Sequence, residues 1–172
     1  MTSGTPPGTR ILGRLGAADG KGVVRMEDRY DTGIDDLWTA ITDPARLARW
    51  LGEVAGDLRP GGEFRARYFD GWDGTGRVAA CEAPRHLLVM MTHTGQAEEQ
   101  SVEATLTADG EQTILVWEER GMPLDLLAPY GAGIQVHVED LAAHLAGREH
   151  SDAMARWGEL SPAYQDLAAG VS

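Results

Sequence analysis

One stretch near the C-terminal end of the chain, GIQVHVEDLAAHLAG at residues 133–147, limits the possible folds most strongly. Its apolar residues recur at steps of four, three and four, which is the spacing of one helix face: Ile134, Val138, Leu141 and Leu145. Glycines at both ends, with Arg148 directly after the second, predict where the helix begins and ends. Because this is the longest apolar face in the chain, we expect the helix to cover a sheet.

The sequence before this helix predicts the strands of that sheet. Alternating or β-branched runs indicate strands at residues 23–30, 63–69, 75–82, 86–93, 101–107 and 113–119. The Asp109-Gly110 pair predicts an antiparallel hairpin between the last two strands. Residues 121–130 contain two prolines and are expected to form a loop that leads into the long helix.

Two short helices are predicted after the first strand. Residues 33–41 begin with acidic side chains, which a helix N-terminus favours, and continue with apolar residues at helical spacing. In DPARLARWLGE, which follows, Asp43 suits an N-cap and Pro44 suits the first helical position. The order of elements predicts an α+β fold.

The length of 172 residues suits a single domain with flanking segments. Residues 1–20 are rich in Gly, Pro, Ser and Thr, and we expect a mobile N-terminal tail without chemistry. Residues 21–148 form the predicted domain. Residues 149–172 form an extension, in which Ser161 and Pro162 are expected to begin a short amphipathic helix packed on the outside.

Composition narrows the possible partners and location. A net charge of −12 disfavours binding to nucleic acid or to anionic lipid. No segment has the apolar length of a signal peptide or a membrane span, so membrane insertion is not expected. The single cysteine, Cys81, cannot form an internal disulfide, which favours a soluble, cytoplasmic protein. We expect a monomer or a weak homodimer.

The familiar motifs of cofactor and metal binding do not fit this chain. A strand follows the glycines of DGWDGTGRV (Gly71, Gly74 and Gly76), whereas a dinucleotide-binding turn needs a helix there. His137 and His144 lie seven apart, and a zinc-protease helix needs two His four apart. We therefore predict no metal and no cofactor, with His137 at the edge of the apolar helix face, looking into a cavity, and His144 in solvent.

Acidic and aromatic side chains are the other candidate site residues. Glu118 and Glu119 are interpreted as solvated groups on a strand edge, because acids are abundant and no orienting partner is evident. Aromatic residues in the predicted elements either fill the core or line a pocket, and they include Trp38, Phe64, Tyr68 and Trp117. Met90 and Met91 would give such a pocket adaptable walls.

Four segments taken together, DPARLARWLGE, RPGGEFRARY, VEATLTADGEQTILVWEERG and GIQVHVEDLAAHL, resemble the START-like superfamily. This superfamily is also called SRPBCC or Bet v 1-like, and the resemblance is to its branch related to the activator of Hsp90 ATPase, over about residues 21–147. It implies a helix-grip fold, in which a curved antiparallel sheet wraps around a long C-terminal helix. It also implies a cavity between the sheet and that helix.

The resemblance implies a noncatalytic protein that binds a hydrophobic or aromatic small molecule in this cavity. The predicted ligand-binding residues are Trp38, Phe64, Tyr68, Met90, Trp117, Ile134, His137, Val138 and Leu141. One alternative is a self-sacrifice resistance protein, in which an enediyne antibiotic cuts the chain at a glycine near the cavity: Gly71, Gly74, Gly76, Gly131 or Gly133. Another is a polyketide cyclase or aromatase with His137 or Tyr68 as a proton carrier.

Overall fold

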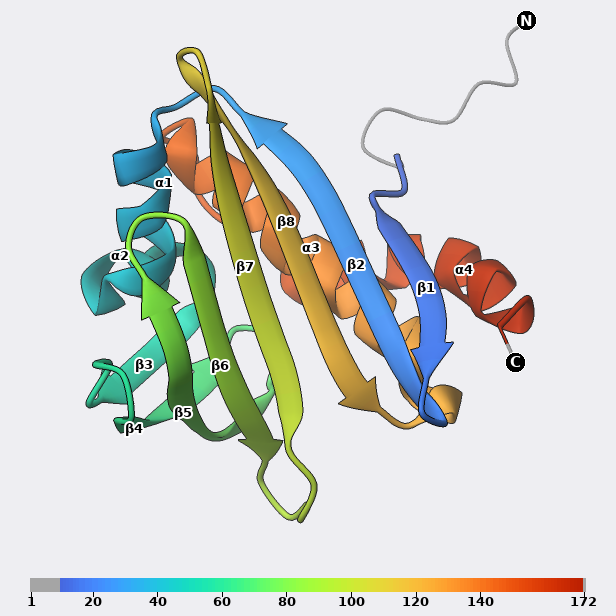
Figure 1. Ribbon diagram of the computed structural model, residues 1–172. Helices are drawn as coiled ribbons and strands as arrows, with labels where there is room; N and C mark the ends of the chain where they lie inside the picture. The colour runs from blue at the N-terminus through green and yellow to red at the C-terminus, as the bar shows by residue number, and fades with distance from the viewer. Residues whose placement is uncertain (1–9, 172) are drawn as a thin grey trace, which may run out of the picture.

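The computed structural model describes residues 10–171 as one curved, antiparallel, eight-stranded sheet with helices on one side of it (Figure 1). The strands are β1 (Gly13–Ala18), β2 (Lys21–Tyr30), β3 (Gly52–Gly56), β4 (Glu63–Tyr68), β5 (Asp73–Glu82), β6 (His86–His93), β7 (Gln100–Asp109) and β8 (Gln112–Met122). The helices are α1 (Ile34–Thr42), α2 (Pro44–Trp50), the short 3₁₀ helix η1 (Leu124–Leu126), α3 (Leu127–Leu145) and α4 (Ala153–Ala169).

The long helix α3 runs behind the sheet, with α1 and α2 near one of its ends and α4 beside β1 (Figure 1). The strand order is β1-β2-β8-β7-β6-β5-β4-β3, and every neighbouring pair is antiparallel. The core lies between the sheet and α3, where Val24, Met26, Leu106 and Leu141 are buried. The predicted α+β helix-grip fold is confirmed.

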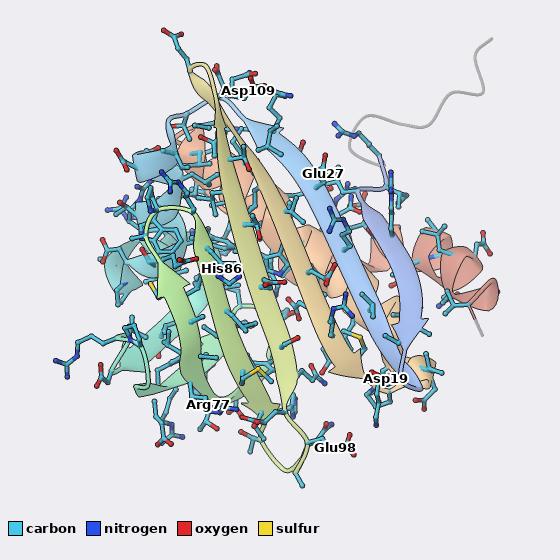
Figure 2. The ribbon with its side chains drawn as sticks, viewed as in Figure 1. Asp19, Glu27, Arg77, His86, Glu98 and Asp109 are labelled. Carbon is cyan, nitrogen blue, oxygen red and sulfur yellow. The ribbon has the colours of Figure 1, made fainter. Side chains whose placement is uncertain are left out.

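The other face of the sheet carries charged side chains and faces the viewer in Figure 2. Several form ion pairs across neighbouring strands and turns: Lys21 with Glu98, Arg77 with Glu99, and Arg29 with Asp109. His86 forms a hydrogen bond with Glu103 at 2.7 Å. Apolar and charged residues therefore alternate along the strands as the sequence predicts. Of the helices within residues 10–171, none combines the length and apolar character needed to cross a bilayer.

The locally encoded elements match their predictions. Asp109 pairs with Gln112 across the β7–β8 hairpin, and Gly110 has a φ of +63°, which glycine adopts without strain. The Asp43 side chain caps α2 by accepting the Ala45 N–H at 3.2 Å, and Pro44 is the first helical residue. The buried Trp50 donates its indole N–H to the Ala40 carbonyl at 2.9 Å, which fastens α2 to α1.

The start of the long helix differs from the prediction. α3 begins at Leu127 rather than at Gly133, and most of the loop expected at residues 121–130 is regular structure. Pro129 lies in the first turn, where a backbone N–H has no helical partner, so the proline costs no hydrogen bond. The end is as predicted: Gly147 has a φ of +76°, and the Arg148 N–H donates to the Ala143 carbonyl at 2.8 Å.

The expected tail and the region after the first helices also hold strands that were not predicted. Residues 1–9 of the tail lie outside the described residues, but residues 13–18 form β1, which pairs with β2 through Leu15 and Val24. β3 follows α2 and pairs with β4. Both strands lie at edges of the sheet, where backbone pairing on one side suffices and little apolar patterning is needed.

The extension forms one longer helix instead of a short one that begins at Ser161. The Asp152 side chain caps α4 by accepting the Ala155 N–H at 3.2 Å, and the helix then continues through Pro162. The N–H that Pro162 lacks would have bonded to the Gly158 carbonyl, and the Ser161 hydroxyl donates to the Trp157 carbonyl at 2.8 Å.

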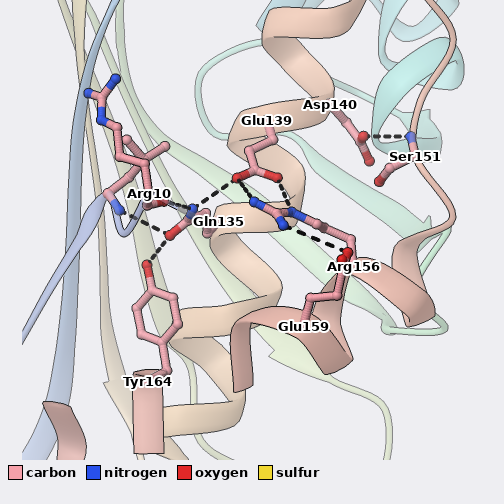
Figure 3. Close-up of polar contacts among 9 residues, drawn as sticks. Arg10, Gln135, Glu139, Asp140, Ser151, Arg156, Glu159 and Tyr164 are labelled. Carbon is pink, nitrogen blue, oxygen red and sulfur yellow. Dashed lines mark hydrogen bonds and ion pairs between the residues drawn. The ribbon is translucent and has the colours of Figure 1, made fainter. Parts of the chain in front are cut away.

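A polar network joins α4 to α3 and β1 (Figure 3). We call it the α3–α4 cluster: Gln135, Glu139, Arg156 and Tyr164. The fully buried Gln135 side-chain N–H donates to the Arg10 carbonyl at 2.6 Å and to Glu139 at 2.9 Å. Its oxygen accepts the Leu12 N–H at 3.0 Å and the Tyr164 hydroxyl. Arg156 binds Glu139 through two hydrogen bonds of 2.7 and 2.8 Å.

Candidate functional site

Two adjoining chambers lie between the sheet and the helices. The polar chamber, about 270 Å³, is lined by Tyr68, Asp70, Trp72, Glu119, Tyr130, Gly133, His137 and Trp157, among others. The apolar chamber, about 140 Å³, is lined by Trp38, Leu47, Phe64, Val78, Leu87 and Trp117, among others. Tyr68, Met91 and Val102 line both chambers, so they form the partition between them.

A tight turn between β4 and β5 brings Asp70 and Trp72 to the polar chamber. Gly71 between them has a φ of +96°, which favours glycine, and the Trp72 N–H donates to the Asp70 carboxylate at 3.0 Å. Asp70 Oδ2 lies 3.1 Å from Nε2 of His137 on α3. The Tyr68 ring stacks on Trp72 at 4.9 Å and meets the edge of His137 at 5.3 Å. The turn therefore holds an aromatic and acidic wall against α3.

The pKa values of Asp70 and Tyr68 show how this wall is charged. Burial alone would raise the pKa of Asp70, but the hydrogen bond and electrostatic attraction of His137, together with the Trp72 N–H, outweigh burial, so the pKa is lowered. Burial raises the pKa of the Tyr68 hydroxyl, and the nearby Glu119 and Asp70 carboxylates raise it further. Asp70 is therefore an anion and Tyr68 a neutral hydrogen-bond donor near neutral pH.

Glu119 faces the same chamber from the sheet. It pairs with Val24 and Val102 in the neighbouring strands, on the inward side, and accepts the Trp117 indole N–H at 2.8 Å. Burial raises its pKa, and the negative charge of Asp70 adds to this effect. The prediction of a solvated strand edge is therefore wrong for Glu119, whereas the neighbouring Glu118 points outward and pairs with Arg25 and Arg120.

The residues predicted to bind a ligand divide between the two chambers and the core. Tyr68, Ile134 and His137 line the polar chamber, and Trp38, Phe64, Tyr68 and Trp117 line the apolar one. Val138 and Leu141 are buried in the core and line neither chamber. Met90 lies on the outer face opposite Arg77, so the expectation that it lines the cavity is not met, and Met91 takes that place. His144 is half-buried beside Arg46 rather than free in solvent.

The sequence interpretation missed most of the polar groups. Asp70, Gln100, Tyr130 and Trp157 come from connections or from segments expected to be loop or exterior, and the Gln100 amide donates to the Tyr130 hydroxyl at 3.2 Å. A signal for Glu119 was present, because it lies two residues after Trp117 and so shares its face. Tyr68 and His137, the proton carriers named for the enzyme alternative, both line the polar chamber, and that alternative remains a prediction.

Comparison with known proteins decides the family. The sequence model of the family described as activator of Hsp90 ATPase homolog 1-like protein matches residues 31–146. The chain belongs to this family. Membership establishes the fold that the activator of Hsp90 ATPase homolog 1-like proteins share. It does not by itself assign a co-chaperone activity. The matched span contains both carboxylates of the polar chamber and His137, whereas β1 and α4 lie outside it.

Solved structures extend the likeness. The crystal structure of CalU16 from Micromonospora echinospora is 28% identical, with a TM-score of 0.74 over 91% of this chain and 96% of that chain. DynU16, described as a protein in the dynemicin biosynthetic locus, is 29% identical with a TM-score of 0.70. That match covers 78% of this chain and 51% of DynU16, about half of its length. Among curated protein sequences, none matched the chain significantly.

Proposed function

We propose that this protein binds a hydrophobic, aromatic small molecule in the two chambers without converting it chemically. The observation that carries the proposal is the pair of adjoining chambers between the sheet and the helices, whose walls are mainly aromatic and aliphatic. Such walls favour transfer of an apolar ligand from water, and the few polar groups at one end fix its orientation. Met91 in the partition has a flexible, unbranched side chain, so it can yield to a ligand that spans both chambers.

A fluorescent probe and one pair of variants test this proposal. N-phenyl-1-naphthylamine, whose emission rises in apolar surroundings, is titrated into the wild type, Met91→Trp and the matched control Met90→Trp. Met91→Trp fills the partition and is expected to weaken binding by about tenfold or more, since about 1.4 kcal/mol of lost binding energy is enough. Met90→Trp adds the same side chain to the outer face and is expected to bind like the wild type. Unchanged emission with the wild type would contradict the proposal.

A second candidate function is self-sacrifice resistance to an enediyne. It is supported by the likeness to DynU16, which belongs to the biosynthetic locus of the enediyne dynemicin. Of the five glycines named as targets, Gly133 lines the polar chamber. A Cβ added there would lie 3.7 Å from Asp70 Oδ2 and 3.9 Å from Trp157 Cδ1, so its Cα is open to a ligand. Gly131, in contrast, is covered by the Tyr164 ring.

The proposed cleavage step uses dioxygen as a co-reactant. The enediyne diradical takes a hydrogen atom from the Gly133 Cα, and the resulting carbon radical adds O₂ to form a peroxyl radical. The thiol that activates the enediyne donates a hydrogen atom to this radical, and breakdown of the resulting hydroperoxide cleaves the backbone. Dynemicin activated by a thiol in air should therefore yield fragments that end near residue 133, detected by mass spectrometry. Gly133→Ala should suppress them, whereas Gly158→Ala on the exposed face of α4 should not. Absence of such fragments from the wild type would remove this candidate.

A further inference from the structure

The charged groups of the polar chamber are unevenly balanced. Two carboxyl groups line it, from Asp70 and Glu119, and none of the described residues that line it is Lys or Arg. Asp70 has a cation-capable partner, because His137 Nε2 lies 3.1 Å from it. Glu119 accepts a hydrogen bond from the neutral Trp117 indole, and among the described residues no ion pair involves it. The chamber therefore holds one carboxyl group to which the described residues bring no cationic side chain within ion-pair distance.

Aromatic rings line the same chamber from several elements. Tyr68 comes from β4, Trp72 from the following turn, Tyr130 from α3 and Trp157 from α4. Their indole and phenol faces attract a cation through the ring quadrupole, by about 0.5–2 kcal/mol each when water is excluded. A carboxyl group among such rings matches the chemistry of a protonated amine better than that of an anion. An anionic group would meet both carboxyl groups and no Lys or Arg.

We propose that the natural ligand is an apolar amine, whose ammonium group pairs with Glu119 among these aromatic rings while its apolar body extends past Met91 into the apolar chamber. This rests on the proposed function, small-molecule binding in the two chambers, and adds the chemical class of the ligand. Trp157 Nε1 donates to the Pro129 carbonyl at 3.2 Å, which holds its ring against α3 at the edge of the chamber.

Proton linkage follows from the raised pKa of Glu119. An ammonium group favours the ionised carboxylate, so binding expels the proton that Glu119 carries at low pH. Affinity for the amine should rise with pH until Glu119 is ionised and fall again only when the amine loses its own proton. The other titratable groups that face the chamber come from β4, the β4–β5 turn, β6 and α3: Tyr68, Asp70, His93, Tyr130 and His137. A Glu119 variant is therefore needed to separate the contribution of Glu119 from those of the other groups.

Three ligands that share one bicyclic body test the proposal: 2-aminotetralin as the cation, tetralin-2-ol as the neutral compound and tetralin-2-carboxylate as the anion. Isothermal titration at pH 7.5 should give about tenfold tighter binding of the amine than of the alcohol, with the carboxylate weakest. Glu119→Gln keeps the shape and should remove most of this preference without changing the affinity for the alcohol. Glu118→Gln, the matched control on the outer face of β8, should preserve the preference.

The possible outcomes separate this inference from the proposed function. Equal binding of amine and alcohol, or tightest binding of the carboxylate, would overturn the ligand class but leave small-molecule binding intact. Failure of all three ligands and of the naphthylamine probe would overturn both. If Glu119→Gln does not fold, the wild type still decides the question in a series of titrations from pH 4.5 upward. The affinity for the amine should rise as Glu119 ionises, while a rise that is the same for the alcohol would contradict the proposal.

Discussion

The helix α3 carries polar groups on two sides, and the two groups are built differently. The α3–α4 cluster satisfies its buried amide completely, because Gln135 meets two acceptors and two donors and Glu139 meets Arg156 in a double hydrogen bond (Figure 3). On the other side, His137 and Asp70 pair, but Glu119 accepts one indole N–H and faces an empty volume. Satisfied networks stabilise a fold, whereas spare polar capacity in a cavity is available to a ligand.

The largest change in the free energy of unfolding is expected from Gln135→Leu. The substitution leaves the Leu12 N–H and the Tyr164 hydroxyl without their buried acceptor, at about 1–3 kcal/mol for each unsatisfied group. We expect the free energy of unfolding to fall by about 2–4 kcal/mol in urea denaturation. Gln165→Leu, on the exposed face of α4, should change it by less than about 0.5 kcal/mol. A loss below about 1 kcal/mol for Gln135→Leu would show that the cluster is not a stabilising element.

A smaller effect is expected from Tyr164→Phe. The hydroxyl accepts the Gly13 N–H at 3.0 Å and donates to Gln135, so its removal should cost about 1–2 kcal/mol. Burial raises the pKa of Tyr164 to about 12, from an ordinary value of 10.0. The unfolded chain therefore releases this proton first, and wild-type stability should fall from pH 10 upward. The difference between wild type and variant in alkaline urea denaturation should shrink over that range, and a constant difference would contradict the assignment.

The smallest effect on stability is expected from Glu119→Gln. Unlike the two substitutions in the α3–α4 cluster, it should raise the free energy of unfolding rather than lower it. Burial raises the pKa of Glu119, so the unfolded chain binds fewer protons than the native one above the ordinary value of 4.5. Wild-type stability should therefore decline as the pH rises from 4.5 through the raised pKa, and the glutamine variant should avoid this loss. We expect the variant to equal the wild type in acid and to be more stable by up to about 1 kcal/mol near neutral pH. If the glutamine variant were less stable than the wild type at neutral pH, Glu119 would be a group that stabilises the fold.

Elements encoded by neighbouring residues were predictable from the sequence. The cap of α2 depends on Asp43 and Pro44, and the β7–β8 hairpin depends on Asp109 and Gly110, so each is fixed within a few residues. The α3 end at Gly147 is of the same kind. Prediction failed where pairing with another strand decides the structure of a segment. β1 is an example, because its Gly-rich sequence forms a strand only through pairing with the edge of β2.

The chamber was predictable in outline but not in its chemistry. LLVMM in β6 is apolar throughout, so no alternation reveals that Met91 rather than Met90 points inward. Contact between Asp70 and His137 joins residues far apart in the chain, and no local pattern encodes it. Glu119 is different, because it alternates with Leu115 and Trp117 on one face of β8, and this pattern is visible in the sequence. The many other acidic residues of the chain made the pattern easy to overlook.

The position of Trp157 has a consequence for how such proteins diverge. This residue supplies part of the chamber wall from a helix that the shared family sequence does not include. A relative with another side chain at position 157 would present a different wall to the chamber, while the sheet and the Asp70–His137 pair kept their sequence. Under the proposed function, a substitution outside the shared family sequence can therefore change the shape of the chamber without any change in the strands.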